Sequence, residues 1–246
     1  GKHFATREKF YPTLFVDSKR KTKYKTLDGL PVEPVEPGTV RDCREFIKKY
    51  NEVENFNIYG NERYIYQYIS EKYPEVEVKF DTEKIKLTTI DIEVASENGF
   101  PDVESCAEEV LLITLQDYAT KQIRTWGRGA FNNKQDNVIY KGFNTEYELL
   151  TDFIHWWMIE DNTPEVITGW NSKLYDIPYL CRRIDRILGE KLKKRMSPWG
   201  LVTEEETYIS GRKHLSYDIG GVSQLDYLDL YKKFTYKAQE SYRLDY

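Results

Sequence analysis

Residues 85–94 read Ile-Lys-Leu-Thr-Thr-Ile-Asp-Ile-Glu-Val and place two acidic residues, Asp91 and Glu93, near the end of an apolar strand. Side chains two residues apart on a strand point to the same face, so the two carboxylates project together. Two like charges held this close repel each other unless a cation lies between them. Hard oxygen ligands suit Mg²⁺ or Mn²⁺, so the segment predicts half of a divalent-metal site. The alternative is an exposed edge strand with two solvated acids, which the apolar flanking residues disfavour.

A second informative segment lies downstream, where residues 167–180 read Ile-Thr-Gly-Trp-Asn-Ser-Lys-Leu-Tyr-Asp-Ile-Pro-Tyr-Leu. The pattern predicts a short strand, a turn around Asn171 and a helix that begins near Tyr175. Asp176 then lies in the first turn of the helix, where the helix dipole favours an anion. From the residues alone, Asp176 could be no more than an acid that stabilises a helix start.

Taken together, the two segments resemble the first two exonuclease motifs of family B DNA polymerases, Asp-Ile-Glu and Asn-x-x-x-Tyr-Asp-x-Pro-Tyr. Further stretches are similar to the T-even-type bacteriophage subfamily: residues 97–102, 186–200 and 225–234. The similarity runs through most of the chain from about Tyr11. A third exonuclease motif, Tyr-x-x-x-Asp, and the palm motifs of the polymerase are not found. The resemblance therefore implies an N-terminal fragment of a polymerase, or one subunit of a split polymerase.

The resemblance implies two-metal hydrolysis of the terminal phosphodiester at a DNA 3′ end, with Mg²⁺ or Mn²⁺ and two ions per complete site. The implied catalytic residues, which are also the implied metal ligands, are Asp91, Glu93 and Asp176. The implied DNA-binding residues are Asn171, Phe100, Arg212 and Lys213. Of these, Asn171 would orient the terminal nucleotide, and Phe100 would stack on or beside the last base. Arg212 and Lys213 lie at the tip of an expected β-hairpin and suit phosphate contact, and the alternative for this tip is a solvated loop. Without the third motif, the chain alone is expected to bind metal weakly and to cleave slowly.

The implied partners are a single-stranded DNA 3′ end or primer-template DNA, the remainder of the polymerase, and a sliding clamp that the parent protein binds. The implied location is the cytoplasm of an infected bacterial host, without membrane association. A net charge of −5 argues against a general nucleic-acid coat but leaves room for a local groove. Three scattered cysteines are expected to be buried thiols, because their number and spacing fit neither a disulfide framework nor a zinc site.

Two other functions remain open at this stage. The chain could be a regulatory module that binds RNA or single-stranded DNA without catalysis. It could also be a stand-alone RNase H-like nuclease, which would need its own late acidic ligand. Only Asp226 and Asp229 lie in a suitable place, and the apolar residues around them predict a buried strand instead.

The expected fold class is α/β, with an RNase H-like (DnaQ-like) exonuclease core over residues 81–246 and a smaller mixed α+β N-terminal domain over residues 1–80. Beyond the first acidic strand, the core is expected to contain antiparallel strands at residues 110–116 and 122–126. A helix is expected to follow the capping sequence Thr-Glu-Tyr-Glu at residues 145–148. Alternating residues around a glycine predict a β-hairpin over residues 203–218.

The first eighty residues follow a different pattern. Three prolines at positions 31, 34 and 37 predict a loop, and apolar spacing predicts a helix over residues 40–50. Aromatic and β-branched residues predict short strands at 56–59 and 64–68. The basic run at residues 19–25 fits a solvated hairpin, or a contact to single-stranded nucleic acid in which basic and aromatic residues alternate.

Overall fold

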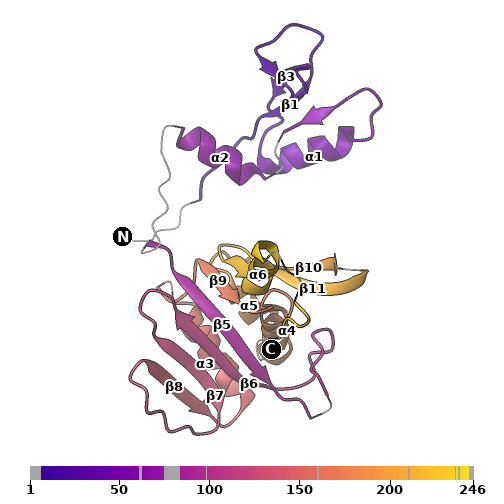
Figure 1. The fold of residues 1–246 in the computed structure, drawn as a ribbon. Helices are drawn as coiled ribbons and strands as arrows, with labels where there is room; N and C mark the ends of the chain where they lie inside the picture. Colours follow the sequence, from indigo (N-terminus) through magenta and orange to yellow (C-terminus); the bar gives the residue numbers. More distant parts are fainter. Residues whose placement is uncertain are drawn as a thin grey trace. The chain divides into compact units, whose positions relative to one another are not determined.

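The structure is a computed structural model that describes residues 7–60, 63–74, 84–97, 99–159, 161–209, 211–235, 237 and 239–243. The chain divides into two compact units, Gly1–Phe80 and Asp81–Tyr246 (Figure 1).

The first unit combines a small antiparallel sheet with two helices. The strands are ordered β2-β3-β1-β4 and comprise β1 (Leu14–Asp17), β2 (Tyr24–Lys25), β3 (Pro31–Val35) and β4 (Ile58–Tyr59). The helices are α1 (Val40–Tyr50) and α2 (Tyr64–Lys72). Helix α1 has the bounds that the sequence predicts, and Thr39 caps it by accepting a hydrogen bond from the Asp42 amide. Leu14, Cys43 and Tyr64 form the buried centre of the unit.

The predicted strand at residues 64–68 is wrong, because this segment begins helix α2. Its aromatic residues are common in strands, but tertiary contacts favour a helical spacing here. Tyr64 is buried, the side-chain amide Nε2 of Gln67 donates to the Thr13 carbonyl at 3.3 Å, and the centre of the Tyr68 ring lies 5.4 Å from that of the Phe10 ring. Positions i, i+3 and i+4 therefore share one inward face, which only a helix provides.

The predicted proline loop is also wrong in part, because Pro31–Val35 forms strand β3. Pro31 is the first residue of the strand and lies opposite Lys25, and Pro34 lies opposite Phe15. Proline has a fixed φ that is compatible with extended backbone, and its cost in a sheet is one missing N–H donor.

The second unit is built on a six-stranded mixed sheet with the order β12-β9-β5-β6-β7-β8 (Figure 1). Its strands are β5 (Leu87–Val94), β6 (Val110–Asp117), β7 (Ile123–Arg128), β8 (Val138–Phe143), β9 (Val166–Gly169) and β12 (Ser223–Asp226). Strand β5 lies inside the sheet, antiparallel to β6 and parallel to β9. The α/β class is confirmed. The sequence analysis missed β8, which extends the three antiparallel strands by pairing in parallel with β7.

The helices of this unit supply much of its apolar core. They are α3 (Glu146–Trp157), α4 (Asp176–Leu188), the short α5 (Glu190–Lys193) and α6 (Tyr227–Phe234). Helix α3 begins as predicted, with Thr145 and Glu148 forming a reciprocal capping box. It lies against β7 and β8, whereas α4 lies against β5. Five side chains of α3 are fully buried in the core: Leu149, Leu150, Phe153, Ile154 and Trp157.

A long hairpin follows these elements. Strands β10 (Val202–Ile209) and β11 (Arg212–Ile219) pair antiparallel along their whole length, from Val202 opposite Ile219 to Ile209 opposite Arg212. The hairpin prediction is confirmed. Gly211 has a φ of 76° at the turn, a conformation that glycine adopts without steric cost.

The three cysteines are all free thiols in buried positions, which confirms their prediction. Within the described ranges, no helix combines the length and the apolar character that crossing a membrane requires.

Candidate active site

Strand β5 presents its two acids on one face of the sheet. Along the strand, Ile90 and Ile92 are 1% and 5% exposed, while the intervening Asp91 and the following Glu93 are exposed. The alternation is the one that the sequence predicts. The pairing with β6 shifts register between Glu93 and Val94, so the ladder is irregular directly after the second acid.

Strand β9 brings the second segment close to β5. The strand ends at Gly169, and a Cβ atom at this position would lie 2.6 Å from the Ile90 carbonyl oxygen. Only glycine permits this close approach of the two backbones. Asn171 follows in the left-handed region, with a φ of 61°, and turns the chain toward the start of α4.

Asp176 is the first residue of α4, and its side chain reaches back to β5. Its Oδ1 accepts a hydrogen bond of 3.0 Å from the backbone amide of Ile92, the residue between Asp91 and Glu93. The side chain is buried, with 4% of its surface exposed. The structure therefore brings Asp176 to the strand that carries the other two acids.

The electrostatics of this carboxylate are unfavourable for its charged form. Burial is the largest cause and raises the pKa of Asp176 to about 7, the Ile92 amide opposes the shift, and the charge of Asp91 adds to it. Loss of hydration also raises the pKa of Asp91. Burial, followed by the charges of Asp176 and Glu93, raises the pKa of Tyr175 to about 12. A buried carboxylate next to another acid is electrostatically suited to a cation.

The three acids do not yet form a ligand shell. In the described part of the chain, no group of three His, Cys, Asp or Glu side chains is placed to hold a metal ion. No described lysine, arginine or histidine forms an ion pair with Asp91, Glu93 or Asp176. Carboxylate oxygens without a basic partner are a donor set that fits Mg²⁺ or Mn²⁺ chemically.

Phe100 lies beside the start of α4. Its side chain is 86% exposed, and its ring centre lies 5.4 Å from that of Tyr175. The Tyr175 ring in turn lies 5.8 Å from that of Tyr179, so three aromatic rings follow one another next to Asp176. An exposed ring held in this way is available to stack on a nucleobase.

Of the remaining predicted DNA-binding residues, Arg212 and Lys213 lie on the hairpin, whereas Asn171 lies in the turn before α4. Arg212 and Lys213 begin β11 on the hairpin, and Lys213 forms an ion pair of 2.6 Å with Glu206 on the facing strand. Among the contacts of the described residues, none joins Arg212 or Lys213 to the acids of β5. Asn171 lies five residues before Asp176, and its backbone amide donates to Asp226.

Asp226 has a structural role, although the sequence offered it only as a late ligand. Its carboxylate is buried and accepts three backbone hydrogen bonds, from Asn171 at 3.1 Å, Lys173 at 2.9 Å and Leu228 at 2.9 Å. It thereby caps α6 and fixes the turn before α4. An Asp directly before a helix is a recognisable N-cap, so this role could have been found in the sequence.

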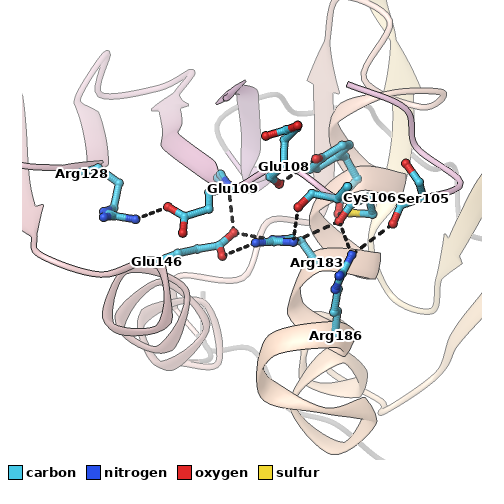
Figure 2. Close-up of polar contacts among 11 residues, drawn as sticks. Ser105, Cys106, Glu108, Glu109, Arg128, Glu146, Arg183 and Arg186 are labelled. Atoms are coloured by element: carbon cyan, nitrogen blue, oxygen red, sulfur yellow. Dashed lines mark hydrogen bonds and ion pairs between the residues drawn. The ribbon is translucent and has the colours of Figure 1, made fainter. Parts of the chain in front are cut away.

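A second buried group that the sequence analysis missed is the ion pair between Glu146 on α3 and Arg183 on α4 (Figure 2). Both side chains are nearly inaccessible, at 5% and 7% exposure. A run of arginines on the α4 sequence, Arg182-Arg183-x-x-Arg186, was the available signal, but no local pattern tells which acid such a residue meets.

An α/β unit with two acids on an internal strand and a third at a neighbouring helix start defines a candidate metal-dependent hydrolase. A family model described as DNA polymerase family B, exonuclease domain, matches residues 43–246. The chain belongs to this family, whose exonuclease domains are metal-dependent in general.

Several DNA polymerases of viruses are similar to the chain. The chain is 32% identical to the DNA-directed DNA polymerase of Escherichia phage RB69, over 98% of the chain and 29% of that protein. It is 30% identical to the DNA-directed DNA polymerase of Enterobacteria phage T4, over 100% of the chain and 30% of that protein. It is 32% identical to the DNA polymerase catalytic subunit of Human herpesvirus 6A, over 64% of the chain and 16% of that protein. The predicted resemblance to a family B exonuclease region of the phage type is confirmed. The chain spans less than a third of the length of each of these relatives.

Proposed function

We propose that the chain is the 3′–5′ proofreading exonuclease region of a replicative DNA-directed DNA polymerase. It would remove nucleotides from a DNA 3′ end by metal-assisted hydrolysis. One observation carries the proposal: buried Asp176 accepts the amide of Ile92 between two exposed acids, and no described basic side chain pairs with any of the three.

Asp91, Glu93 and Asp176 would hold Mg²⁺ or Mn²⁺, with two ions in a site completed by ligands from a third motif. When bound, the ions would supply an activated water and stabilise the leaving oxygen. Asp176 holds its proton up to a pH of about 7, so it would release that proton when a cation binds. The Ile92 amide would keep the Asp176 carboxylate turned toward β5 throughout.

We assign the contacts to DNA to predicted DNA-binding side chains that are free to meet a substrate. Phe100 would stack on the terminal base, and Asn171 would orient the terminal nucleotide through its side-chain amide, which makes no hydrogen bond to the described residues. Arg212 would contact a backbone phosphate. Lys213 would contribute less, because Glu206 already neutralises it.

We further propose an RNase H-like core over residues 81–246 and an N-terminal domain over residues 1–80. Single-stranded DNA 3′ ends or primer-template DNA, the remainder of the polymerase and a sliding clamp would be the partners. The site of action would be the cytoplasm of an infected bacterium. A stand-alone nuclease is disfavoured, because Asp226, one of the two candidates for its late ligand, already accepts three backbone hydrogen bonds that cap α6 and fix the turn before α4.

The proposal is tested by the double substitution Asp91→Ala and Glu93→Ala in a polypeptide that contains this chain and a third exonuclease motif. Mg²⁺-dependent release of 3′-terminal nucleotides should fall by more than about 100-fold, because loss of metal ligands costs more than loss of their outer partners. The matched control is Glu52→Ala with Glu54→Ala, which also removes two exposed acids spaced by two residues. Undiminished exonuclease activity in the Asp91 and Glu93 variant would refute the proposal.

Residues 1–246 alone should bind a single-stranded oligonucleotide weakly and in a salt-sensitive manner, and should degrade it more slowly than the longer polypeptide. No nucleotide incorporation on a primed template is expected from the chain alone.

A further inference from the structure

The chain segment Glu104–Glu108 connects the Phe100 loop to β6. Side chains of helix α4 bind the backbone carbonyls of this segment. Five consecutive carbonyl oxygens of this segment accept hydrogen bonds from four α4 side chains. The contacts are Arg182 to Glu104 at 2.6 Å, Arg186 to Ser105 at 3.3 Å and to Cys106 at 3.1 Å, Arg183 to Cys106 and Ala107 at 3.1 Å each, and Tyr179 to Glu108 at 2.8 Å. Figure 2 shows the contacts that Arg183 and Arg186 make with Cys106 and Ser105.

These contacts impose a conformation that the local sequence does not favour. Cys106 has a φ of 46°, in the left-handed region that residues with a Cβ atom seldom adopt. Its carbonyl accepts from two arginines, and its thiol lies 3.4 Å from the Tyr179 carbonyl oxygen. Strained backbone persists where its surroundings determine it, and here they include the side chains of α4 and the Asp102 carbonyl, which accepts the Cys106 amide at 2.9 Å.

The buried ion pair is the centre of this arrangement. Glu146 accepts two bonds from Arg183, at 2.6 and 2.7 Å, and its Oε1 also accepts the Val110 amide at 2.9 Å. The ion pair therefore connects four elements: Arg183 on helix α4 binds Glu146 on helix α3 and the carbonyls of the held segment, and Glu146 also binds the first residue of β6. Buried ion pairs add little net stability compared with apolar packing, and fixing one arrangement is the better use for such a pair.

The same helix contacts the candidate site. Arg183 follows Asp176 by seven residues, which is close to two helical turns, so both lie on nearly the same side of α4. Asp176 binds β5 before the Phe100 loop, and Arg183 binds the chain after it. Between these two attachments, Phe100 contacts Tyr175, the residue that precedes α4.

We propose that Arg183 and Glu146 are positioning residues for the exonuclease reaction, which hold the Phe100 loop so that its ring meets the 3′-terminal base of single-stranded DNA. This inference rests on the proposed function, and it adds two residues that contact neither the DNA nor the metal ions. The expected consequence is that substitutions at Arg183 act through Phe100.

The test is a double-mutant cycle of Arg183→Lys and Phe100→Ala in the complete protein to which this sequence belongs. Lysine keeps the charge of arginine but lacks its planar fork of donors, so it cannot hold Glu146 and two carbonyls together. Each single variant should lower kcat/KM for 3′-terminal nucleotide release about 10-fold, the size of one lost stacking contact. The double variant should also lose about 10-fold, because the two changes remove one shared interaction.

A second readout does not depend on catalysis. A 3′-terminal 2-aminopurine in a single-stranded oligonucleotide should change fluorescence on binding to the parent protein without metal. Both single variants should lose most of this change. Glu146→Gln, which keeps the shape of the side chain, provides a second way to weaken the pair if the lysine variant does not fold. The control is Arg128→Lys, at an exposed ion pair with Glu109 near the same segment, which should leave both readouts unchanged (Figure 2).

Multiplicative losses, near 100-fold in the double variant, would show that Arg183 acts independently of Phe100 and would overturn the inference. So would unchanged kinetics and fluorescence in both Arg183→Lys and Glu146→Gln. If the parent protein neither binds nor degrades the oligonucleotide, the proposed function fails and this inference fails with it. Exonuclease activity that depends on Asp91 and Glu93 but not on Arg183 would overturn only the inference about Arg183 and Glu146. The proposed function would then stand.

Discussion

Asp176 and Glu146 are two buried carboxylates of the same unit that differ in their counter-charge. Each lies in the first turn of a helix, with 4% and 5% of its surface exposed. Each accepts a strand amide, Ile92 at 3.0 Å and Val110 at 2.9 Å. Glu146 is then neutralised by the two-bond contact with Arg183, whereas Asp176 meets no basic side chain in the described residues and lies near Asp91.

The difference separates an acid that is paired within the fold, Glu146, from one that we propose as a metal ligand, Asp176. Placing a charged carboxylate in the interior is costly unless it is paired, and a protein that leaves one unpaired stabilises its protonated form or a bound cation. The raised pKa of Asp176 is the expected sign of this condition. Burial alone would not have distinguished the two residues.

The largest stability effect is expected from Glu146→Ala. The change leaves Arg183 buried without a counter-charge and the Val110 amide without its acceptor. Unfolding free energy should fall by about 3–5 kcal/mol, as measured by urea titration of the chain. Replacing both residues with apolar ones, Glu146→Leu with Arg183→Met, should cost less than Glu146→Ala alone. A loss below about 1 kcal/mol in the single variant would mean that the pair is not buried as described.

Asp176→Asn should instead raise the unfolding free energy, by an amount that depends on pH. In the folded protein the pKa of Asp176 is raised to about 7, so the folded state keeps this proton while the unfolded state loses it above a pH of about 4. Without metal, the unsubstituted chain therefore loses stability as the pH rises from 4 to 7, because Asp176 must give up its proton. The asparagine variant does not lose this stability, because its side chain stays neutral. The variant should be more stable than the parent at pH 8, by at most about 4 kcal/mol, and the difference should vanish near pH 4. Urea titrations at several pH values measure it, and a difference that does not depend on pH would contradict the assignment.

The smallest effect is expected from Arg128→Met, which breaks the ion pair with Glu109. Both side chains are partly exposed, at 29% and 51%, so water and salt already screen the interaction. Unfolding free energy should change by less than about 1 kcal/mol. A loss as large as that of Glu146→Ala would remove the distinction between the buried and the exposed pair.

Local patterns in the sequence predicted much of this structure. The alternation around Asp91 and Glu93, the capping box at Thr145, and the start of α4 at Asp176 all depend on neighbours within a few residues. Helix α2 was misread because its inward face is set by contacts to Thr13 and Phe10, distant in sequence.

The contacts of the site that the sequence did not predict also join residues that are distant in sequence. The contact from Ile92 to Asp176 joins residues 84 positions apart, and that of Glu146 with Arg183 joins residues 37 apart. Through the family resemblance, the sequence predicts that Asp91, Glu93 and Asp176 carry the chemistry, and this stays a prediction. It could not predict which acid is neutralised, because that depends on the tertiary fold.

We propose that the acids of β5 and α4 form a cation site, and the described residues provide no counter-charge for these acids. Calorimetric titration of the chain with MnCl₂ at pH 8 tests it most directly. The parent chain should bind Mn²⁺, the triple variant Asp91→Asn, Glu93→Gln, Asp176→Asn should lose this binding, and Arg128→Met should retain it. Equal Mn²⁺ binding by the triple variant and the parent chain would contradict the account.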